Sequence, residues 1–246
     1  MKIALNVLVC PASRRQIVPW VQWHLSLGAD MISIVAHQPE AIARQLAEVC
    51  RLGCDIGIIK DDSPMTLDMQ RIAVSGAANR LFDGGADVVI CLDDDEWLRP
   101  GFLSRMRCDD FKLDKPTHLR GYNYFELEST VGKMPWPVAM RWRNDGVGYE
   151  YAKPVVPKAC WTGAYTAGCH WVQGVGQYYY FDKAIHHYTF RAGKPVYAHR
   201  RGRPDAVYRP LTDAERDERH LVYDDTMAKA ITCMLVETPQ PEPVLP

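Results

Sequence analysis

Residues 31–62 read MISIVAHQPEAIARQLAEVCRLGCDIGIIKDD. A short apolar run, an amphipathic stretch and a second apolar run follow one another, and this order predicts strand, helix and strand. Pro39 stands near the first turn of the expected helix and Gly53 follows its last turn, where these residue types are favoured. Two strands joined by such a helix lie parallel in one sheet. The stretch therefore predicts an α/β fold.

The same alternation continues on both sides of this unit. KIALNVLVC (2–10) predicts a strand, and QIVPWVQWHLSLGAD (16–30) predicts a helix with an apolar stripe. LDMQRIAVSGAANRLFDGG (67–85) predicts a helix that ends at glycines, and ADVVICLDDDE (86–96) predicts a fourth strand. Four strands connected by right-handed helical crossovers make a mostly parallel, Rossmann-like half over residues 1–105.

The remainder of the chain has a different pattern. Residues 106–210 contain many Gly, Pro and aromatic residues with short β-type runs, which predicts mixed and antiparallel strands packed onto the first half of the same domain. Residues 211–236 predict a C-terminal helix that begins at Thr212 or Asp213, and the Pro-rich residues 237–246 predict a disordered tail. The fold class predicted is α/β, with a Rossmann-like first half and a β-rich second half.

Composition limits the function classes. The 246 residues carry a formal net charge of −1, which gives no general attraction to nucleic acid or to a membrane. YAHRRGRP (197–204) is the one basic run, and its pattern suits a flexible loop as well as a nucleic-acid patch, so we expect no nucleic-acid binding. No window approaches the roughly 18 apolar residues of a membrane span. Eight cysteines without a CxxC motif predict a reduced protein in the cytoplasm, either free or peripheral at the inner face of the membrane.

Four acids, Asp93 to Glu96, follow the apolar run of the fourth predicted strand. In open parallel sheets, ligands bind beyond the carboxyl ends of the strands. Two carboxylates about 4 Å apart repel by roughly 4 kcal/mol at an effective dielectric near 20, so a cation between them or good solvation is needed. In extended chain Asp93 and Asp95 point the same way. They suit Mn²⁺ or Mg²⁺ carrying a diphosphate, and the alternative is a solvated acidic turn.

Five segments resemble, in the same order, a known enzyme family. ADVVICLDDDEWLRP resembles the "D-x-D-E-F/W-hydrophobic" signature, and WVQWHLSLGADMISIVAHQ resembles an opening with the pattern W-x-x-(H/Y)-H-x-x-x-G. Gln70, Lys158 with the later Gly-Cys-His, and HHYTFRAGKPVYAHRRGR match further segments. Together they resemble family 2-like glycosyltransferases of the GT-A fold, in the branch that includes family 92-like enzymes. The resemblance spans roughly residues 3 to 203.

What the resemblance implies is transfer of a sugar from a nucleotide-sugar donor, a UDP-sugar first of all, to a hydroxyl of a glycan or another acceptor. It also implies a divalent cation, Mn²⁺ or Mg²⁺, held by Asp93 and Asp95. Two segments depart from the family pattern. The family has Asn-Glu near the first strand and D-N-x-S-x-D after the second, whereas this chain has Asn6-Val7 and His37-Gln38-Pro39. The family's uridine contacts are therefore not carried over.

The resemblance assigns further roles in the second half. His170 completes the metal shell, and His187 is the rival for that task, while His186 points to the other strand face. The residues expected to bind the donor diphosphate are Lys158, His187, Arg191 and Arg201. Glu96 and Trp97 are expected to contact sugar or acceptor, with the alternative that Glu96 only orients its loop.

Direct displacement at the anomeric carbon needs a general base on the acceptor side. RWRNDGVGYE (141–150) offers Asp145 first and Glu150 second, and the alternative is an ordinary Asn-Asp-Gly turn. We expect an inverting, hexosyltransferase-type enzyme. Two other functions remain open. A Mg²⁺-dependent nucleotidyltransferase also needs paired carboxylates, although neither GxGxxG nor GxxxxGK[ST] occurs, and a catalytically degenerate nucleotide- or carbohydrate-binding protein is the second.

Overall fold

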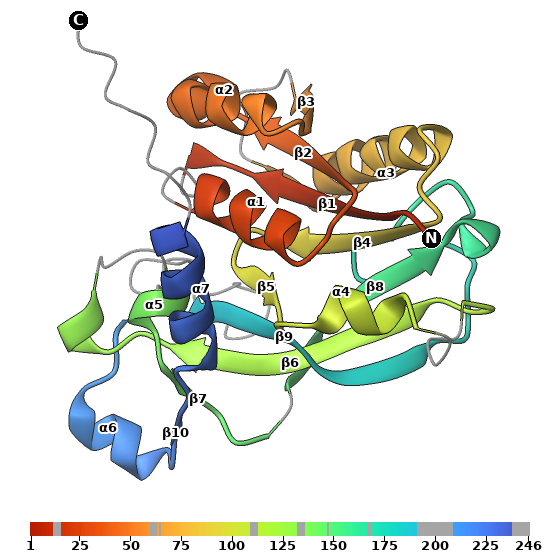
Figure 1. Ribbon diagram of the computed structural model, residues 1–246. Helices are drawn as coiled ribbons and strands as arrows, with labels where there is room; N and C mark the ends of the chain where they lie inside the picture. Colours follow the sequence, from red (N-terminus) through yellow and green to blue (C-terminus); the bar gives the residue numbers. More distant parts are fainter. Residues whose placement is uncertain are drawn as a thin grey trace, which may run out of the picture.

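The computed structural model of the chain describes most of its residues. The described residues are 1–11, 16–59, 63, 65–108, 113–131, 136–146, 148–166, 169–190 and 209–237. Within them a single ten-stranded sheet runs through the molecule, and helices cover both faces of its parallel part (Figure 1). The α/β class predicted from the sequence is confirmed.

The N-terminal half has the Rossmann-like arrangement that the alternating pattern predicts. Its elements are β1 (Ile3–Val9), α1 (Ile17–Ser26), β2 (Met31–His37), η2 (Pro39–Ile42), α2 (Ala43–Arg51), β3 (Asp55–Ile59), α3 (Leu67–Asp83) and β4 (Val88–Asp93). The four strands are parallel and lie in the spatial order β4-β1-β2-β3. The helix expected from Pro39 begins as a 3₁₀ turn and becomes α-helical at Ala43.

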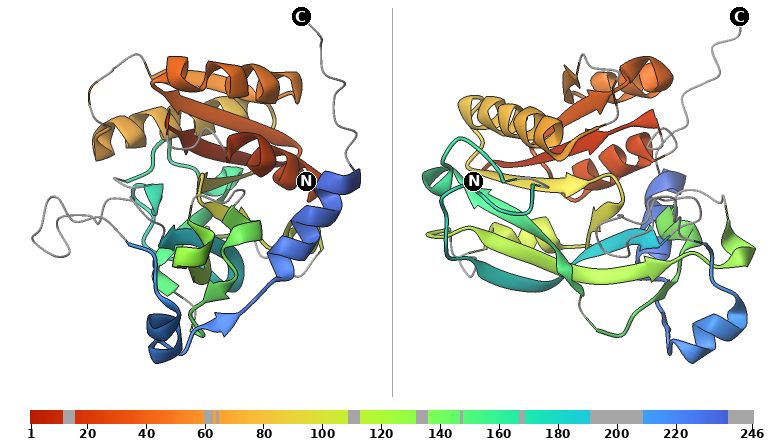
Figure 2. Two further views of the ribbon diagram at one scale, coloured as in Figure 1. Left: turned by 90° about the vertical axis from the view of Figure 1, so that its left-hand side faces the viewer. Right: turned by 180° about the vertical axis from the view of Figure 1, so that it is seen from behind.

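Alternation along the strands sends side chains to two separate cores. In β1, Leu5 and Val7 are buried in a cluster with α1 and α2, whereas Ala4 is buried in a second cluster with α3. Figures 1 and 2 show the same division, with α1 and α2 on one side of the strands and α3 on the other. Because both faces are covered, the strands are apolar throughout, and their carboxyl ends are left as the open edge.

The acidic stretch is not one extended strand, which corrects the sequence prediction. β4 ends at Asp93, Asp94 and Asp95 form a turn, and a new strand β5 (Glu96–Leu98) follows. β5 leaves the parallel sheet and pairs with a strand of the second half instead. The simple alternation that would place Asp93 and Asp95 on one side of a strand therefore does not apply.

The second half continues the same sheet. Its elements are α4 (Phe102–Met106), β6 (Thr117–Phe125), η3 (Glu128–Thr130), α5 (Trp136–Ala139), β7 (Trp142–Arg143), β8 (Gly148–Pro157), η4 (Lys158–Cys160) and β9 (Tyr179–Phe190). β8 is antiparallel to β4 on one side and to β6 on the other, so it joins the two halves. β9 is parallel to β6 and antiparallel to β5. The mixed and antiparallel strands expected here are present.

β6 and β9 approach each other closely at Gly121. A Cβ at this position would lie 1.8 Å from the backbone oxygen of Ile185, so only glycine fits. The register changes at the same point, because Leu119 pairs with Phe181 whereas Gly121 pairs with Ile185. β9 therefore bulges at this place. The pairs after the bulge align the carboxyl ends of β6 and β9, and β9 also pairs there with β5, which follows the acidic turn.

The C-terminal region forms two helices where the sequence predicts one over residues 211–236. α6 (Asp213–Glu218) begins after Thr212, whose hydroxyl caps the first turn as predicted. His220 has a positive φ of 51°, which ends that helix, and β10 (Val222–Tyr223) follows. Asp224 then accepts a hydrogen bond from the backbone N–H of Thr226 at 3.0 Å, at the start of α7 (Thr226–Glu237).

α7 packs against α1 and α5, so the end of the described chain returns to the first half (Figure 1). Residues 238–246 of the predicted tail lie outside the described residues. Among the helices that the structure describes, each is too short or too polar to cross a lipid bilayer.

Candidate functional site

The acidic turn lies at the carboxyl end of β4, at the open edge of the parallel sheet. Asp93 is paired in register with Leu8, near the end of β1. The Asp93 side chain is 37% exposed, whereas Asp95 and Glu96 are buried. Of these three acids only Asp93 presents a substantial surface to a ligand in this structure.

α1 fixes the strand that follows the turn. The indole N–H of Trp20 donates to the backbone oxygen of Glu96 at 2.8 Å, and that of Trp23 donates to the backbone oxygen of Leu98 at 2.9 Å. The backbone N–H of Leu98 donates in turn to Nε2 of His24 at 3.2 Å. Three side chains of the segment WVQWH thus hold β5 in place. The sequence shows both segments but not this connection between them.

His24 can fill this role only as a neutral imidazole. Its Nδ1 lies 2.8 Å from the backbone oxygen of Trp20, an acceptor, so Nδ1 carries the proton and Nε2 accepts from Leu98. Burial lowers the pKa of His24 from 6.5 to about 3. The unfolded chain therefore binds a proton between pH 6.5 and 3 that the folded chain does not bind.

Stability is accordingly expected to fall as the pH drops through this window. His24 alone contributes a loss of about 2 kcal/mol in the free energy of unfolding between pH 7 and pH 5. His24→Gln keeps a donor and an acceptor but does not titrate, so its loss over the same interval should be smaller by about that amount. Urea unfolding of both proteins at the two pH values measures the difference. An equal loss in both would contradict the assignment.

A lysine that the sequence prediction missed occupies the centre of the site. Lys153, on β8, is fully buried, and its Nζ lies 2.8 Å from Oδ2 of Asp93 and 3.5 Å from Oε2 of Glu96. Burial would lower the pKa of Lys153, but the two carboxylates outweigh it and raise this pKa well above 10.5. The ammonium is therefore charged. The signal in the sequence is a single lysine inside the apolar strand YAKPVVP.

Lys153 also sets the charge of Asp93. Partial burial would raise the pKa of Asp93, but the ammonium outweighs it and holds that pKa below its ordinary value. Glu96 is different, because burial raises its pKa well above the ordinary range. Its Oε2 accepts a hydrogen bond from the backbone N–H of Asp93 at 2.8 Å, which closes the turn.

The two residues predicted to contact sugar or acceptor are both inside the protein. Glu96 is completely buried, and its contacts with Asp93 and Lys153 support the alternative that it orients the loop. Trp97 is also completely buried, in the core beneath α1. Neither side chain presents a surface to a sugar in this structure.

The two histidines predicted for the site both lie beside the acidic turn. Nε2 of His187, on β9, is 3.6 Å from Oδ1 of Asp95, and its Nδ1 is 3.0 Å from Oδ1 of Asn123. Nδ1 of His170 lies 2.9 Å from the backbone oxygen of Ala152, within hydrogen-bond distance. Burial, followed by the charge of the nearby lysine on β8, lowers the pKa of His170 to about 4, so it is neutral at pH 7.

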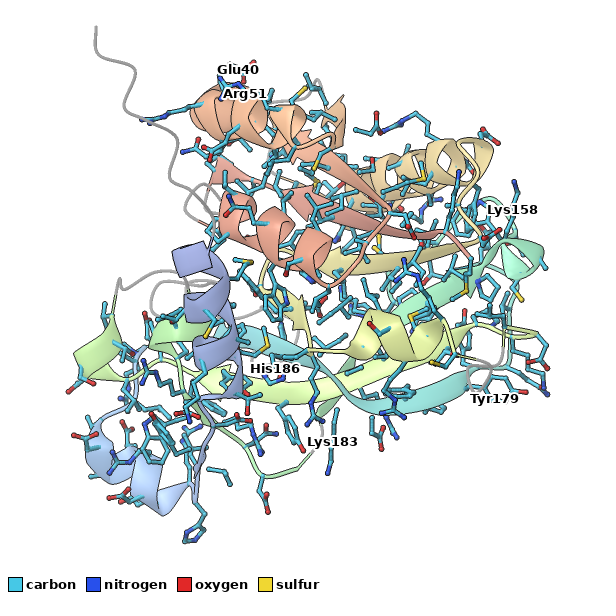
Figure 3. All side chains as sticks on the ribbon, in the orientation of Figure 1. Glu40, Arg51, Lys158, Tyr179, Lys183 and His186 are labelled. Carbon is cyan, nitrogen blue, oxygen red and sulfur yellow. The ribbon has the colours of Figure 1, made fainter. Side chains whose placement is uncertain are left out.

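His186 faces away from these residues, as the strand alternation predicts. Its Nδ1 is 2.6 Å from the hydroxyl of Tyr124, and burial lowers its pKa to about 3. Figure 3 shows it in the interior of the second half, between β6 and α7. It has no place in the candidate site.

The arrangement does not fit the predicted divalent cation at Asp93. Among the residues that the structure describes, no three His, Cys, Asp or Glu side chains converge as the ligands of one metal ion. Oδ2 of Asp93 already holds the Lys153 ammonium. A divalent ion about 4 Å from that ammonium would be repelled by about 8 kcal/mol at an effective dielectric near 20. The donor set thus contains a fixed positive charge where the sequence predicts a metal.

The predicted base lies at the same end of the sheet. Asp145 is exposed in the turn after β7. Two hydrogen bonds join its neighbour Asn144 to Asn123. The backbone N–H of Asn123 donates to Oδ1 of Asn144 at 2.9 Å, and the backbone N–H of Asn144 donates to the backbone oxygen of Asn123 at 3.1 Å. Since Asn123 also contacts His187, three residues, Asn144, Asn123 and His187, link Asp145 to the acidic turn. Glu150 belongs to β8, and its side chain lies outside the described part of the structure.

Three predicted donor-binding residues are not in the described site. Lys158 is a correction, because it lies in η4 at the amino end of β4, where its Nζ donates to the backbone oxygen of Phe82 at 2.8 Å. Six residues of strand, about 20 Å, separate it from the acidic turn, and Figure 3 shows it at the far edge of the molecule. Arg191 and Arg201 lie outside the described residues.

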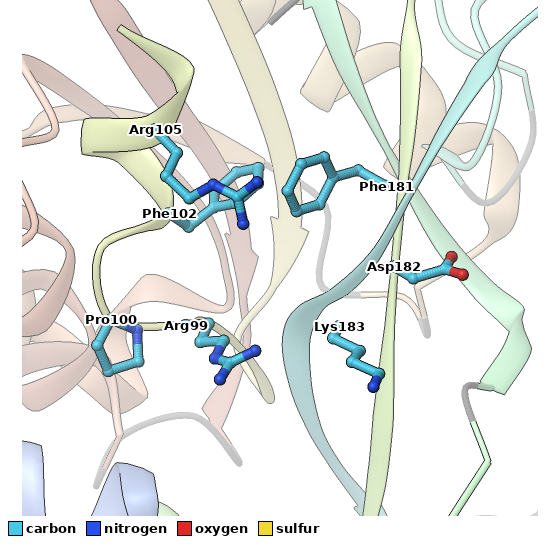
Figure 4. Close-up of a pocket in the computed structure, with 7 residues that line it drawn as sticks. All are labelled: Arg99, Pro100, Phe102, Arg105, Phe181, Asp182 and Lys183. Carbon is cyan, nitrogen blue, oxygen red and sulfur yellow. The ribbon is translucent and has the colours of Figure 1, made fainter. Parts of the chain in front are cut away.

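A hollow of about 280 Å³ lies elsewhere, against the bulge of β9 (Figure 4). It is lined by Arg99, Pro100, Phe102, Arg105, Phe181, Asp182 and Lys183. Arg105 covers the ring of Phe181, and Asp182 points away and pairs with Arg120. None of the residues of the acidic turn lines this hollow, so it is separate from the candidate site.

Comparison with known proteins gives matches in structure and none in sequence. No family model and no curated protein matches the chain. The structure of HddC from Yersinia pseudotuberculosis is similar with 8% identity and a TM-score of 0.45, over 75% of this chain and 92% of that one. TarS 1–349 from S. aureus is similar with 9% identity and a TM-score of 0.44, over 77% of this chain and 61% of that one.

The structure of TarS 1–349 in complex with UDP matches at 9% identity with a TM-score of 0.35, over 58% of this chain and 40% of that one. The chain spans about a quarter of the longer TarS structure. Likeness at this level does not decide function, so the assignment rests on the sheet order and on the site. These define an α/β protein in which a Rossmann-like half and a β-rich half meet around one edge.

Proposed function

We propose that the protein is a glycosyltransferase that uses a nucleoside diphosphate sugar, with a UDP-sugar as the first candidate. The observation that carries the proposal is the group of polar side chains at the carboxyl end of β4. Asp93, Asp95, His170 and His187 come from both halves and meet at the edge where open α/β sheets bind ligands. A solvated acidic turn would not need a buried lysine, a buried histidine and a half-buried histidine around it.

The chemistry follows from the placement of charge. The donor lies across the carboxyl ends of the parallel strands, with its diphosphate near the turn and its sugar toward the second half. The acceptor oxygen forms a bond to the anomeric carbon while the bond from that carbon to the diphosphate breaks, and the electron pair leaves with the diphosphate. Asp145 takes the acceptor proton, and a single displacement of this kind inverts the anomeric configuration.

The finer assignments rest on the sequence motifs. These are the family 92-like branch, the hexosyl group and the hydroxyl of a glycan as acceptor. The cysteines, which form no CxxC motif, predict the cytoplasm as the location, free or at the inner membrane face. Mn²⁺ or Mg²⁺ remains a prediction from the D-x-D motif, and the lysine beside Asp93 argues against it. We assign no step of the transfer to a metal.

Nucleotide binding tests the proposal. We expect UDP, among UDP, GDP, CDP and ADP, to raise the melting temperature of the protein, and Asp95→Asn to reduce that rise because it removes the carboxylate beside His187. Asp83→Asn, an exposed acid at the other end of the sheet, is the matched control and should leave the rise unchanged. Slow release of free sugar from the corresponding donor indicates a transferase.

The alternatives give other results in the same assay. Release of pyrophosphate from a nucleoside triphosphate and a sugar phosphate would indicate a nucleotidyltransferase. Binding of nucleotide without any turnover would indicate a degenerate binding protein. Absence of a melting shift with all four nucleotides would refute the proposed function.

A further inference from the structure

We propose that the ammonium of Lys153 is the built-in cation of this site and takes the place of the divalent ion that a D-x-D motif ordinarily holds. The protein would then bind a nucleoside diphosphate without a metal ion. The geometry of the lysine carries the inference that it replaces a metal ion. Only the consequence that a nucleoside diphosphate binds without a metal ion rests on the proposed function.

Lys153 reaches the turn from a neighbouring strand. β8 runs antiparallel to β4, with Ile90 opposite Val155. This is the last recorded pair of the two strands, and Lys153, two residues before Val155 on β8, is paired with Leu119 of β6. Strand pairing on both sides of β8 fixes the backbone, and complete burial leaves the side chain little freedom. The charge is therefore held at one point.

The ammonium is engaged as a bridging cation would be. Its Nζ is 2.8 Å from Asp93, on β4, and 3.5 Å from Glu96, on β5, so it joins the two strands across the turn. Glu96 in turn accepts the backbone N–H of Asp93. A buried lysine in this position stabilises the turn only while its carboxylate partners remain, because an unpaired buried charge is costly.

One face of the turn remains available to a ligand. Asp93 is bonded to Lys153 through Oδ2, and its side chain keeps a 37% exposed surface. His170 and His187 lie around it as neutral or hydrogen-bonding groups from the second half. The lysine offsets one negative charge of the turn from inside the protein, which lowers the repulsion between the acids and an approaching diphosphate.

A titration with Mn²⁺ alone tests the inference without any nucleotide. We expect the wild-type protein to bind Mn²⁺ only weakly, as followed by the free-ion EPR signal. Lys153→Ala removes the ammonium and leaves space beside Asp93, so Mn²⁺ should bind at least about tenfold more tightly. Adding Asp93→Asn to that variant should remove the gain. Lys158→Ala, at the far end of the same strand segment, is the control and should behave as the wild type.

The Mn²⁺ titration of the wild-type protein tests the proposal even if Lys153→Ala fails to fold. Tight Mn²⁺ binding by the wild-type protein that Asp93→Asn abolishes would overturn the proposal. A folded Lys153→Ala variant that gains no Mn²⁺ affinity would also overturn it, since the lysine would then not stand in a cation site. Circular dichroism establishes which variants are folded.

A second arm measures UDP affinity by calorimetry with EDTA and with Mn²⁺. The wild-type affinity should change by less than about twofold between the two conditions, whereas Lys153→Ala should need Mn²⁺ for binding. Loss of wild-type binding in EDTA would contradict the metal-free site. If no nucleotide binds in either condition, the proposed function fails, and the Mn²⁺ titration still decides the role of Lys153.

Discussion

Gly121→Ala is expected to lower the free energy of unfolding by about 3 kcal/mol or more. The added Cβ would lie 1.8 Å from the backbone oxygen of Ile185, and backbone, unlike a flexible side chain, can move away only if β6 and β9 separate. For a chain of this length, such a loss lowers the melting temperature by about 6–12 °C. Scanning calorimetry measures the change.

Gly76→Ala is the matched control for this substitution. Gly76 lies inside α3, and a Cβ there meets no atom within 4 Å. Alanine in a helix interior should raise stability by about 0.5–1 kcal/mol. A Gly121→Ala protein as stable as the wild type would show that the two strands do not pair as described.

The same substitution should also weaken the candidate site. Two residues beyond Gly121, Asn123 is paired in register with His187, which lies beside Asp95. Separation of the strands would move that histidine away from the turn. We therefore expect the melting shift caused by UDP to decrease in Gly121→Ala, and to remain in Gly76→Ala.

Asp145→Asn is expected to reduce turnover by about 10²–10⁴-fold, the usual contribution of a general base. The side chain is exposed and Asn keeps its size, so the fold and the affinity for UDP should not change. The readout is hydrolysis of the UDP-sugar that gives release of free sugar, in which water takes the acceptor's place. kcat should fall while KM for the donor stays constant.

Asp83→Asn serves as the control for removal of an exposed carboxylate. If Asp145→Asn keeps the wild-type rate, Asp145 is not the base, and the Asn-Asp-Gly segment is an ordinary turn. Glu150→Gln then becomes the next variant, since Glu150 is the other acid of the same segment.

The sequence predicted the elements of the first half because their signals are local. Apolar runs mark the strands, and Gly53 and Gly84 mark helix ends. The second half could not be predicted in the same way, because its order depends on pairing between distant strands. Nothing near Tyr179 indicates that β9 lies parallel to β6 or that it takes β5 from the first half.

The candidate site was predicted in part for the same reason. The acids were found because they follow an apolar strand, and the two histidines were found through the family resemblance; the structure brings them together. Lys153 was missed because its role depends on which strand lies beside β4. The sequence predicts Lys158 instead, which lies five residues later, at the amino end of β4.

The position of Lys153 has a consequence for synthesis of the protein. The four acids of the turn leave the ribosome before the lysine that pairs with Asp93, which follows Asp93 by 60 residues. At about 5–20 residues per second, the delay is about 3–12 s. During that time the nascent turn has no internal counter-charge, and the edge of β4 has no partner strand. The site therefore becomes complete only after most of the polypeptide has been translated.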